Sequence, residues 1–188
     1  MSETSGPRIA VIGGGIAGIS AAAALIGHPS RPTVTLLEAE GQLAHHTTGR
    51  SAAQLIENYG ADAVRPLTRA SLPYFRSPPP EHCPSPLLRN QPVLTVGRPD
   101  QDEVIEAALV EGRRSNPDID EITPAEAGRL FPPLRTERLS RVIIEPGSSD
   151  IDVAALHQAF VRAFAAGGGR VETLARVDAA TRPAAGQP

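Results

Sequence analysis

Three glycines near the start of the chain have a spacing that is typical of phosphate-binding turns. Gly13, Gly15 and Gly18 lie in the stretch GGGIAG, which matches the pattern G-x-G-x-x-G. In such a turn the first glycine allows a sharp reversal after a strand, the second admits a pyrophosphate close to the backbone, and the third lets the next helix pack closely. The N–H groups of Ile16 and Ala17, which would open that helix, could then donate to phosphate oxygens.

The spacing alone is weak evidence, so the elements on either side of it decide its meaning. The run Ile9 to Ile12 is short, apolar and rich in β-branched residues, which predicts a buried strand. The run 20–26 is rich in alanine and favours a helix. The stretch TVTLLE then predicts a second strand that ends at Glu38, 20 residues after Gly18, where a carboxylate commonly binds ribose hydroxyls. The sequence therefore predicts a dinucleotide-binding βαβ unit.

The nature of the dinucleotide stays open at this point. A carboxylate at Glu38 would repel the 2′-phosphate of NADP, and the glycine motif does not distinguish NAD from FAD.

A membrane anchor or a secretion signal is an alternative for the same stretch. Residues 9–27 carry no charge, Arg8 precedes them as in a signal peptide, and their number is near the ~20 that span a bilayer. However, glycine and alanine gain little from entering lipid, and the pattern changes from strand to helix partway. We therefore expect a cytoplasmic chain without a membrane span.

The loop that follows Glu38 concentrates polar groups that suit an extended cofactor. It reads Thr47-Thr48-Gly49-Arg50-Ser51-Ala52-Ala53 and is followed by Gln54. Hydroxyls and backbone N–H groups suit a pyrophosphate and a flavin edge, and Arg50 could neutralise phosphate charge. The alternative is a polar loop that leads into a helix, with Ser51 as its cap.

Together with the glycine motif, this loop resembles the D-amino-acid oxidase-like family of FAD-dependent oxidoreductases. It is most similar to D-amino-acid dehydrogenases of the D-arginine type, which carry a similar S/T-T-G-R-S-A-A loop. The resemblance implies that FAD lies along this part of the chain, that Tyr59 lies near the substrate and that Val177 contacts the adenine. The other implied FAD contacts are Ala17, Glu38, Ala39, Thr47, Thr48, Gly49, Arg50, Ser51, Ala52, Ala53 and Gln54.

The resemblance also implies the reaction. The flavin would accept a hydride from the carbon that bears the amine of an amine or D-amino acid. The resulting imine would be hydrolysed to a keto acid and ammonia.

The likeness extends along most of the chain and implies its domain organisation. The Pro-rich stretch 77–88 is similar to the passage before a strand of the family's substrate domain, and 149–171 is similar to its return helix and strand. We expect an α/β fold in which a Rossmann-like FAD-binding βαβ unit is followed by the start of an α+β substrate domain. The expected parts are 1–76 (FAD-binding), 77–148 (substrate domain), 149–180 (return to the FAD domain) and 181–188 (tail).

Two positions depart from the D-arginine type. Relatives have a histidine where this chain has Gln54, so a proton-handling role at that position is lost. They have an acid near the position of Val93, and an apolar residue cannot pair a guanidinium group. The sequence therefore argues against a preference for basic amino acids.

The length of the chain bears on whether the enzyme is whole. A chain of 188 residues can form a domain with a core, whereas the resemblance implies an enzyme about twice as long. We interpret the chain as a truncated, N-terminal half. Three alternatives remain: one half of a split flavoenzyme with a separately encoded C-terminal half, a non-catalytic remnant, and an NAD-dependent dehydrogenase.

The composition narrows the choice of partners. With 18 basic and 21 acidic residues, the net charge of −3 gives no electrostatic case for nucleic acid. A single cysteine, Cys83, excludes an internal disulfide and fits a reducing compartment. The five histidines have no cysteine or carboxylate at ligand spacing, so we expect no metal site.

The middle of the chain predicts a series of short elements. A helix over 62–75 is expected to be irregular or broken at Pro66 and Pro73. Thr123 and Glu126 form a capping box at the start of another helix, which ends before residue 132. Further predicted elements are strands over 93–96 and 141–145, a helix over 103–112, and a helix capped by Asp152 with a core stripe of Leu156, Phe160 and Phe164.

Overall fold

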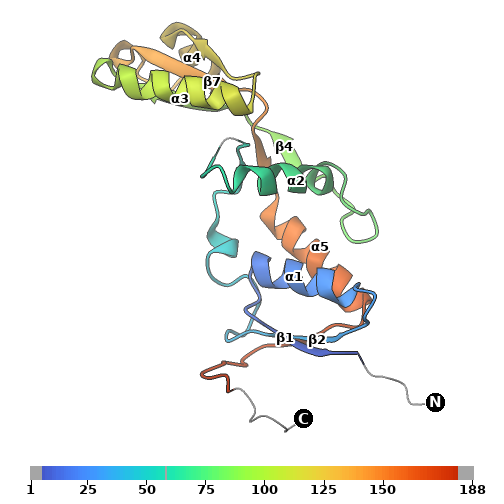
Figure 1. Ribbon diagram of the computed structural model, residues 1–188. Helices are drawn as coiled ribbons and strands as arrows, with labels where there is room; N and C mark the ends of the chain where they lie inside the picture. The colour runs from blue at the N-terminus through green and yellow to red at the C-terminus, as the bar shows by residue number, and fades with distance from the viewer. Residues whose placement is uncertain (1–5, 58, 182–188) are drawn as a thin grey trace, which may run out of the picture. The chain divides into compact units, whose positions relative to one another are not determined.

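The computed structural model describes residues 6–57 and 59–181, so residues 182–188 of the expected tail lie outside the described residues. The chain divides into two compact units (Figure 1). The first unit comprises Met1–Ala52, Pro79–Ser85 and Asp152–Pro188, and the second comprises Ala53–Pro78 and Pro86–Ile151.

The first unit is built on a parallel sheet. Its strands are β1 (Arg8–Ile12), β2 (Thr33–Leu37) and β9 (Arg170–Glu172), in the order β1-β2-β9. Helix α1 (Ile16–Ile26) links β1 to β2, and α5 (Val153–Ala166) leads into β9. Figure 1 shows both helices on the same side of β1 and β2. This arrangement confirms the predicted α/β fold with its strand, turn, helix and strand.

The core of the first unit explains why these segments fold together. Ile19 on α1, Val34 and Leu36 on β2, and Phe164 on α5 are all at most 1% exposed. The alternating burial along β2 places the core side chains on the face that meets the helices. Phe164 therefore belongs to the packing core, as its helical spacing predicts.

The second unit contains antiparallel sheets. In its described part, β5 (Val93–Gly97), β7 (Arg141–Glu145) and β6 (Asp120–Ile122) form one sheet in the order β5-β7-β6. The other sheet has the order β3-β8-β4 and consists of β3 (Gln54–Leu55), β8 (Ser149–Ile151) and β4 (Leu88–Asn90). Its helices are α2 (Arg65–Arg76), α3 (Asp102–Ser115) and α4 (Pro124–Leu130), and short 3₁₀ turns precede α3 at Pro99–Gln101 and β7 at Thr136–Arg138.

The helix starts largely follow the sequence, with one correction. Thr123 Oγ1 accepts from Glu126 N at 3.2 Å while Glu126 Oε2 accepts from Thr123 N at 2.8 Å, which confirms the capping box of α4. The expected break in α2 is wrong, because Arg65–Arg76 is a single helix. Pro66 lies in the first turn, where no intrahelical N–H bond is lost, and Pro73 lies in the last turn.

The functional assignment of the parts 1–76, 77–148 and 149–180 stays a prediction.

Within residues 6–57 and 59–181, none of the helices combines the length and the apolar character needed to cross a bilayer.

Candidate functional site

The turn between β1 and α1 can be formed only with glycine at two positions. Gly13 has a φ of +98°, a left-handed conformation that L side chains rarely adopt, and its N–H donates to Leu37 O at 2.8 Å. A Cβ at Gly18 would lie 1.8 Å from Gly13 O. The start of α1 is therefore pressed directly against the end of β1, as the third glycine of the motif requires.

The carboxylate of Glu38 lies against this turn. Its Oε2 accepts from Gly14 N at 2.7 Å and its Oε1 accepts from Glu40 N at 2.9 Å. The N–H bonds from Glu40 and then Gly14 lower the pKa of Glu38 from its ordinary value of 4.5, although partial burial opposes them. Glu38 is therefore ionised at neutral pH and can accept hydrogen bonds from the hydroxyl groups of a ligand.

The N-terminus of α1 offers backbone donors beside this carboxylate. The bond from Ile19 N to Gly15 O, 3.0 Å long, is formed one turn into the helix, so the N–H groups of Ala17 and Gly18 precede it. Ile16 N donates to Thr48 Oγ1 at 3.0 Å. The helix therefore directs donors and its positive dipole end toward the same side as the loop that carries Thr48.

The loop from residue 39 to residue 52 folds back on the turn. Ala44 N donates to Gly14 O at 3.1 Å, and Gly49 N donates to Ala44 O at 3.1 Å. Arg50 N donates to Thr47 O at 3.1 Å and closes the 3₁₀ turn Thr48–Arg50. Thr48 thereby reaches the glycine motif from 32 residues away. Ala39, Thr47, Gly49, Arg50, Ser51 and Ala52 belong to the same unit and are exposed on it.

The chain after β9 runs alongside Glu38. Glu38 N donates to Glu172 O at 2.8 Å, and Ala175 N donates back to Glu38 O at 2.8 Å. Val177 follows two residues later and is 37% exposed. The first unit therefore brings together most of the residues that the sequence predicts as cofactor contacts.

The remaining predicted residues belong to the second unit. Ala53 has a φ of +60° and its O accepts from Ile151 N at 2.7 Å, and Gln54 pairs with Asp150 where β3 meets β8. Tyr59 is 77% exposed, and its N–H donates to Ile56 O at 3.2 Å.

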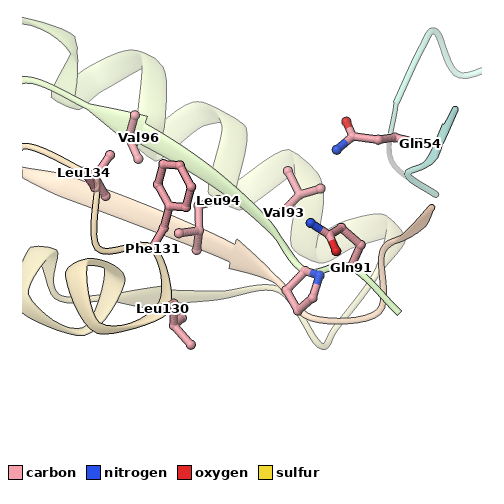
Figure 2. A pocket seen from close by; sticks show the side chains of 9 residues that line it. Gln54, Gln91, Val93, Leu94, Val96, Leu130, Phe131 and Leu134 are labelled. Carbon is pink, nitrogen blue, oxygen red and sulfur yellow. The ribbon is translucent and has the colours of Figure 1, made fainter. Parts of the chain in front are cut away.

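The second unit contains a cavity of about 620 Å³ that Gln54 and Val93 both line (Figure 2). Gln54 and Gln91 supply amide groups, and Val93, Leu94, Phe131 and Leu134 supply apolar walls. The residues that line this cavity carry no formal charge. Figure 2 shows Gln54 on a segment separate from β5, the strand that bears Val93.

One residue that contacts the glycine turn was not predicted from the sequence. His157 on α5 is 2% exposed, and its Nε2 lies 2.9 Å from Gly14 O, 143 residues away along the chain. The one feature of the sequence that could have indicated this contact is the position of His157, a polar residue next to Leu156 in a helix with an apolar stripe. Among the described residues, His, Cys, Asp and Glu side chains form no group of three or more that could hold a metal.

We expect Thr48→Val to weaken the contact between the loop and α1. Valine has nearly the shape of threonine but cannot accept the Ile16 N–H bond, so the free energy of unfolding should fall by about 1 kcal/mol. Urea unfolding of the cofactor-free protein measures this loss. The control is Thr47→Val, an exposed neighbour; equal losses in both variants would contradict a specific role for Thr48.

Comparisons with known proteins agree with this geometry. The model of the DAO family, described as FAD dependent oxidoreductase, matches residues 8–187. Glycine oxidase from Geobacillus kaustophilus superposes with a TM-score of 0.75 at 18% identity, over 89% of this chain and 47% of that one. L-alpha-glycerophosphate oxidase from Mycoplasma pneumoniae, solved with FAD bound, gives 0.72 at 17% identity, over 93% and 45%.

A third solved structure extends the same likeness. Iminodiacetate oxidase from Chelativorans sp. BNC1 gives a TM-score of 0.67 at 22% identity, over 88% of this chain and 46% of that one. At these identities the likeness shows a common fold. The chain spans less than half the length of each of these three structures.

Proposed function

Because the chain belongs to the DAO family of FAD-dependent oxidoreductases, we propose that its first unit binds FAD as the cofactor-anchoring part of an enzyme that oxidises the C–N bond of an amine or D-amino acid. The observation that carries this proposal is the ionised carboxylate of Glu38, which lies 2.7 Å from Gly14 N in the glycine turn of a βαβ unit. Binding of a dinucleotide needs N–H groups that donate to its phosphates and, close by, a carboxylate that accepts from its ribose hydroxyls.

Residues around the glycine turn can be assigned to the pyrophosphate, ribose and adenine of FAD. The backbone N–H groups of Gly15, Ala17 and Gly18 would hold the pyrophosphate. Gly13 and Ile16 would line the same site, since their own N–H groups already donate to Leu37 O and Thr48 Oγ1. Glu38 and Ala39 would contact the ribose, and Val177 the adenine. The segment from Thr47 to Gln54 would extend along the pyrophosphate toward the flavin, with Arg50 offsetting phosphate charge.

The cofactor, when bound, supplies the hydride acceptor, and the protein's part is to hold and orient. The substrate loses a hydride and a proton at the C–N bond, and water converts the resulting imine to a carbonyl compound and ammonia. We propose that Tyr59, which is 77% exposed on the second unit, lies near the substrate.

The cavity of the second unit favours a substrate with an uncharged side chain. Val93 and Gln54, the two departures from the D-arginine type, both line it together with the amide of Gln91, and its remaining walls are apolar. A guanidinium or ammonium group placed there would lose its hydration without gaining a counter-charge. We therefore favour a neutral or apolar side chain over a cationic one.

A split flavoenzyme is the second candidate. Val96, Leu130 and Phe131 are 39%, 60% and 53% exposed around the same cavity, more apolar surface than a complete core would leave open. The chain also spans less than half the length of each of the three solved structures. Together, these two observations support a second polypeptide segment that covers this face.

Visible absorption of the purified protein tests the proposed function. The chain is mixed with FAD or with NAD in its reduced form, passed through a desalting column, and scanned for the visible flavin band or for the near-ultraviolet band of the reduced nicotinamide. We expect FAD to be retained and NAD to be lost. Retained flavin should then be bleached, without oxygen, by amino acids with neutral side chains more readily than by arginine. A folded protein that retains no FAD would refute the proposal.

A further inference from the structure

The peptide between Gly14 and Gly15 is fixed by hydrogen bonds from two separate segments of the first unit. The carbonyl oxygen of Gly14 accepts from Ala44 N at 3.1 Å and from His157 Nε2 at 2.9 Å. Since a carbonyl oxygen can only accept, the imidazole must carry its proton on Nε2. The preceding peptide is held as well, because the N–H of Gly14 donates to Glu38.

The direction of this carbonyl decides the direction of the next N–H group. A trans peptide is planar, and its C=O and N–H point to opposite sides. A Gly14 carbonyl that is held toward α5 therefore turns the Gly15 N–H away from α5. With glycine on both sides of the bond, no Cβ opposes a rotation of the peptide plane. The rotated peptide would present an oxygen, which repels phosphate, in place of the N–H.

The two partners of the carbonyl differ in rigidity. Ala44 lies on a connecting loop with a φ of +57°, whereas His157 projects from the second turn of α5 and is 2% exposed. A buried imidazole is expected to have a partner for its N–H, and the Gly14 carbonyl is that partner. Its neighbours on α5, Ala159 and Phe164, are buried apolar residues, so packing alone does not account for a histidine here.

We propose that His157 is a positioning residue for the cofactor: its Nε2–H holds the Gly14 carbonyl inward so that the Gly15 N–H faces the pyrophosphate. This role rests on the proposed binding of FAD. It assigns to α5, a helix that follows the second unit in the chain, a part in shaping the phosphate site.

Three variants of α5 test the proposal. His157→Leu removes the donor at similar volume, His157→Gln keeps an N–H at a similar reach, and Val161→Ala loosens the same core without touching Gly14. The dissociation constant of FAD is measured by quenching of flavin fluorescence, under conditions in which each variant is folded. The amide signal of Gly15 is followed by NMR in the cofactor-free proteins.

We expect His157→Leu to weaken FAD binding about tenfold, the effect of one lost hydrogen bond, and His157→Gln to stay within about threefold of the wild type. The Gly15 amide signal should shift or broaden in His157→Leu and stay near its original position in the other two variants. Val161→Ala should lower the melting temperature and leave the FAD affinity unchanged.

Two results would overturn the proposal. One is an FAD affinity of His157→Leu equal to that of the wild type; the other is an equal loss of affinity in Val161→Ala, which would show that stability alone is responsible. If the folded wild type binds no FAD, the proposed function is refuted instead. The NMR signal then decides alone whether His157 orients the peptide, and an unchanged signal in His157→Leu refutes that role.

Discussion

Gly18→Ala is expected to lower the free energy of unfolding by about 3 kcal/mol and to weaken FAD binding about 100-fold. A Cβ at this position would lie 1.8 Å from Gly13 O and 3.6 Å from Val11 Cγ1, and the nearer atom belongs to the backbone. Helix α1 must then move away from the turn, which removes the N–H group of Ala17 from the phosphate site and strains the bond from Ile16 N to Thr48 Oγ1. Urea unfolding and an FAD titration measure the two effects.

Gly27→Ala is the matched control at the other end of the same helix. A Cβ there would lie 3.8 Å from Ala24 O, an ordinary contact, and the φ of −82° suits alanine. We expect a change within about 1 kcal/mol of the wild type. Similar losses in both variants would show that α1 tolerates displacement and that the close approach at Gly18 has no special importance.

Glu38→Ala is expected to destabilise the cofactor-free protein by about 2 kcal/mol, because two backbone N–H groups, those of Gly14 and Glu40, lose their acceptor. Binding of FAD should also weaken, since the ribose loses its carboxylate. Glu38→Gln keeps one acceptor oxygen and should show a smaller loss of stability. Chemical unfolding and FAD titration, each on the same preparations, give these values.

The charge of Glu38 also predicts a dependence on pH. Because hydrogen bonds to its ionised form lower the pKa of Glu38 in the folded state, its stabilising effect is complete above the ordinary value of 4.5 and is lost as the pH falls through the lower folded pKa. Glu38→Gln should lack this part of the acid destabilisation. Glu40→Ala removes an exposed carboxylate that contacts His46 instead of the turn, so an equal change in its profile would contradict the assignment.

The elements of the glycine motif could be predicted because their causes are local. The reversal at Gly13 needs a residue that tolerates a φ of +98°, and β1 and α1 differ in the period of their apolar residues. The cap of α5 is equally local, since Asp152 Oδ1 accepts from Ala155 N at 2.8 Å, three residues away. Proline was misjudged in α2, because its effect depends on its position within the helical turns.

The short strands of the second unit were harder to foresee. Strand β3 contains two residues, and β8 and β4 contain three each. Such segments are too short to show an alternating pattern, and they become strands by pairing with one another across the chain. The cavity that Gln54 and Val93 both line draws its residues from separate segments of the chain, so its uncharged lining could not be predicted from either residue alone.

The sequence by itself determined the glycine turn, the carboxylate that follows β2 and the family to which they point, since each depends on residues that are near neighbours in the chain. Only the tertiary structure decided that β9 joins the sheet beside β2, that Thr48 meets Ile16 and that His157 meets the Gly14 carbonyl. Those contacts join residues 32 to 143 positions apart. They form when α1, β2 and α5 pack around one core, and no local sequence pattern encodes packing between segments so far apart.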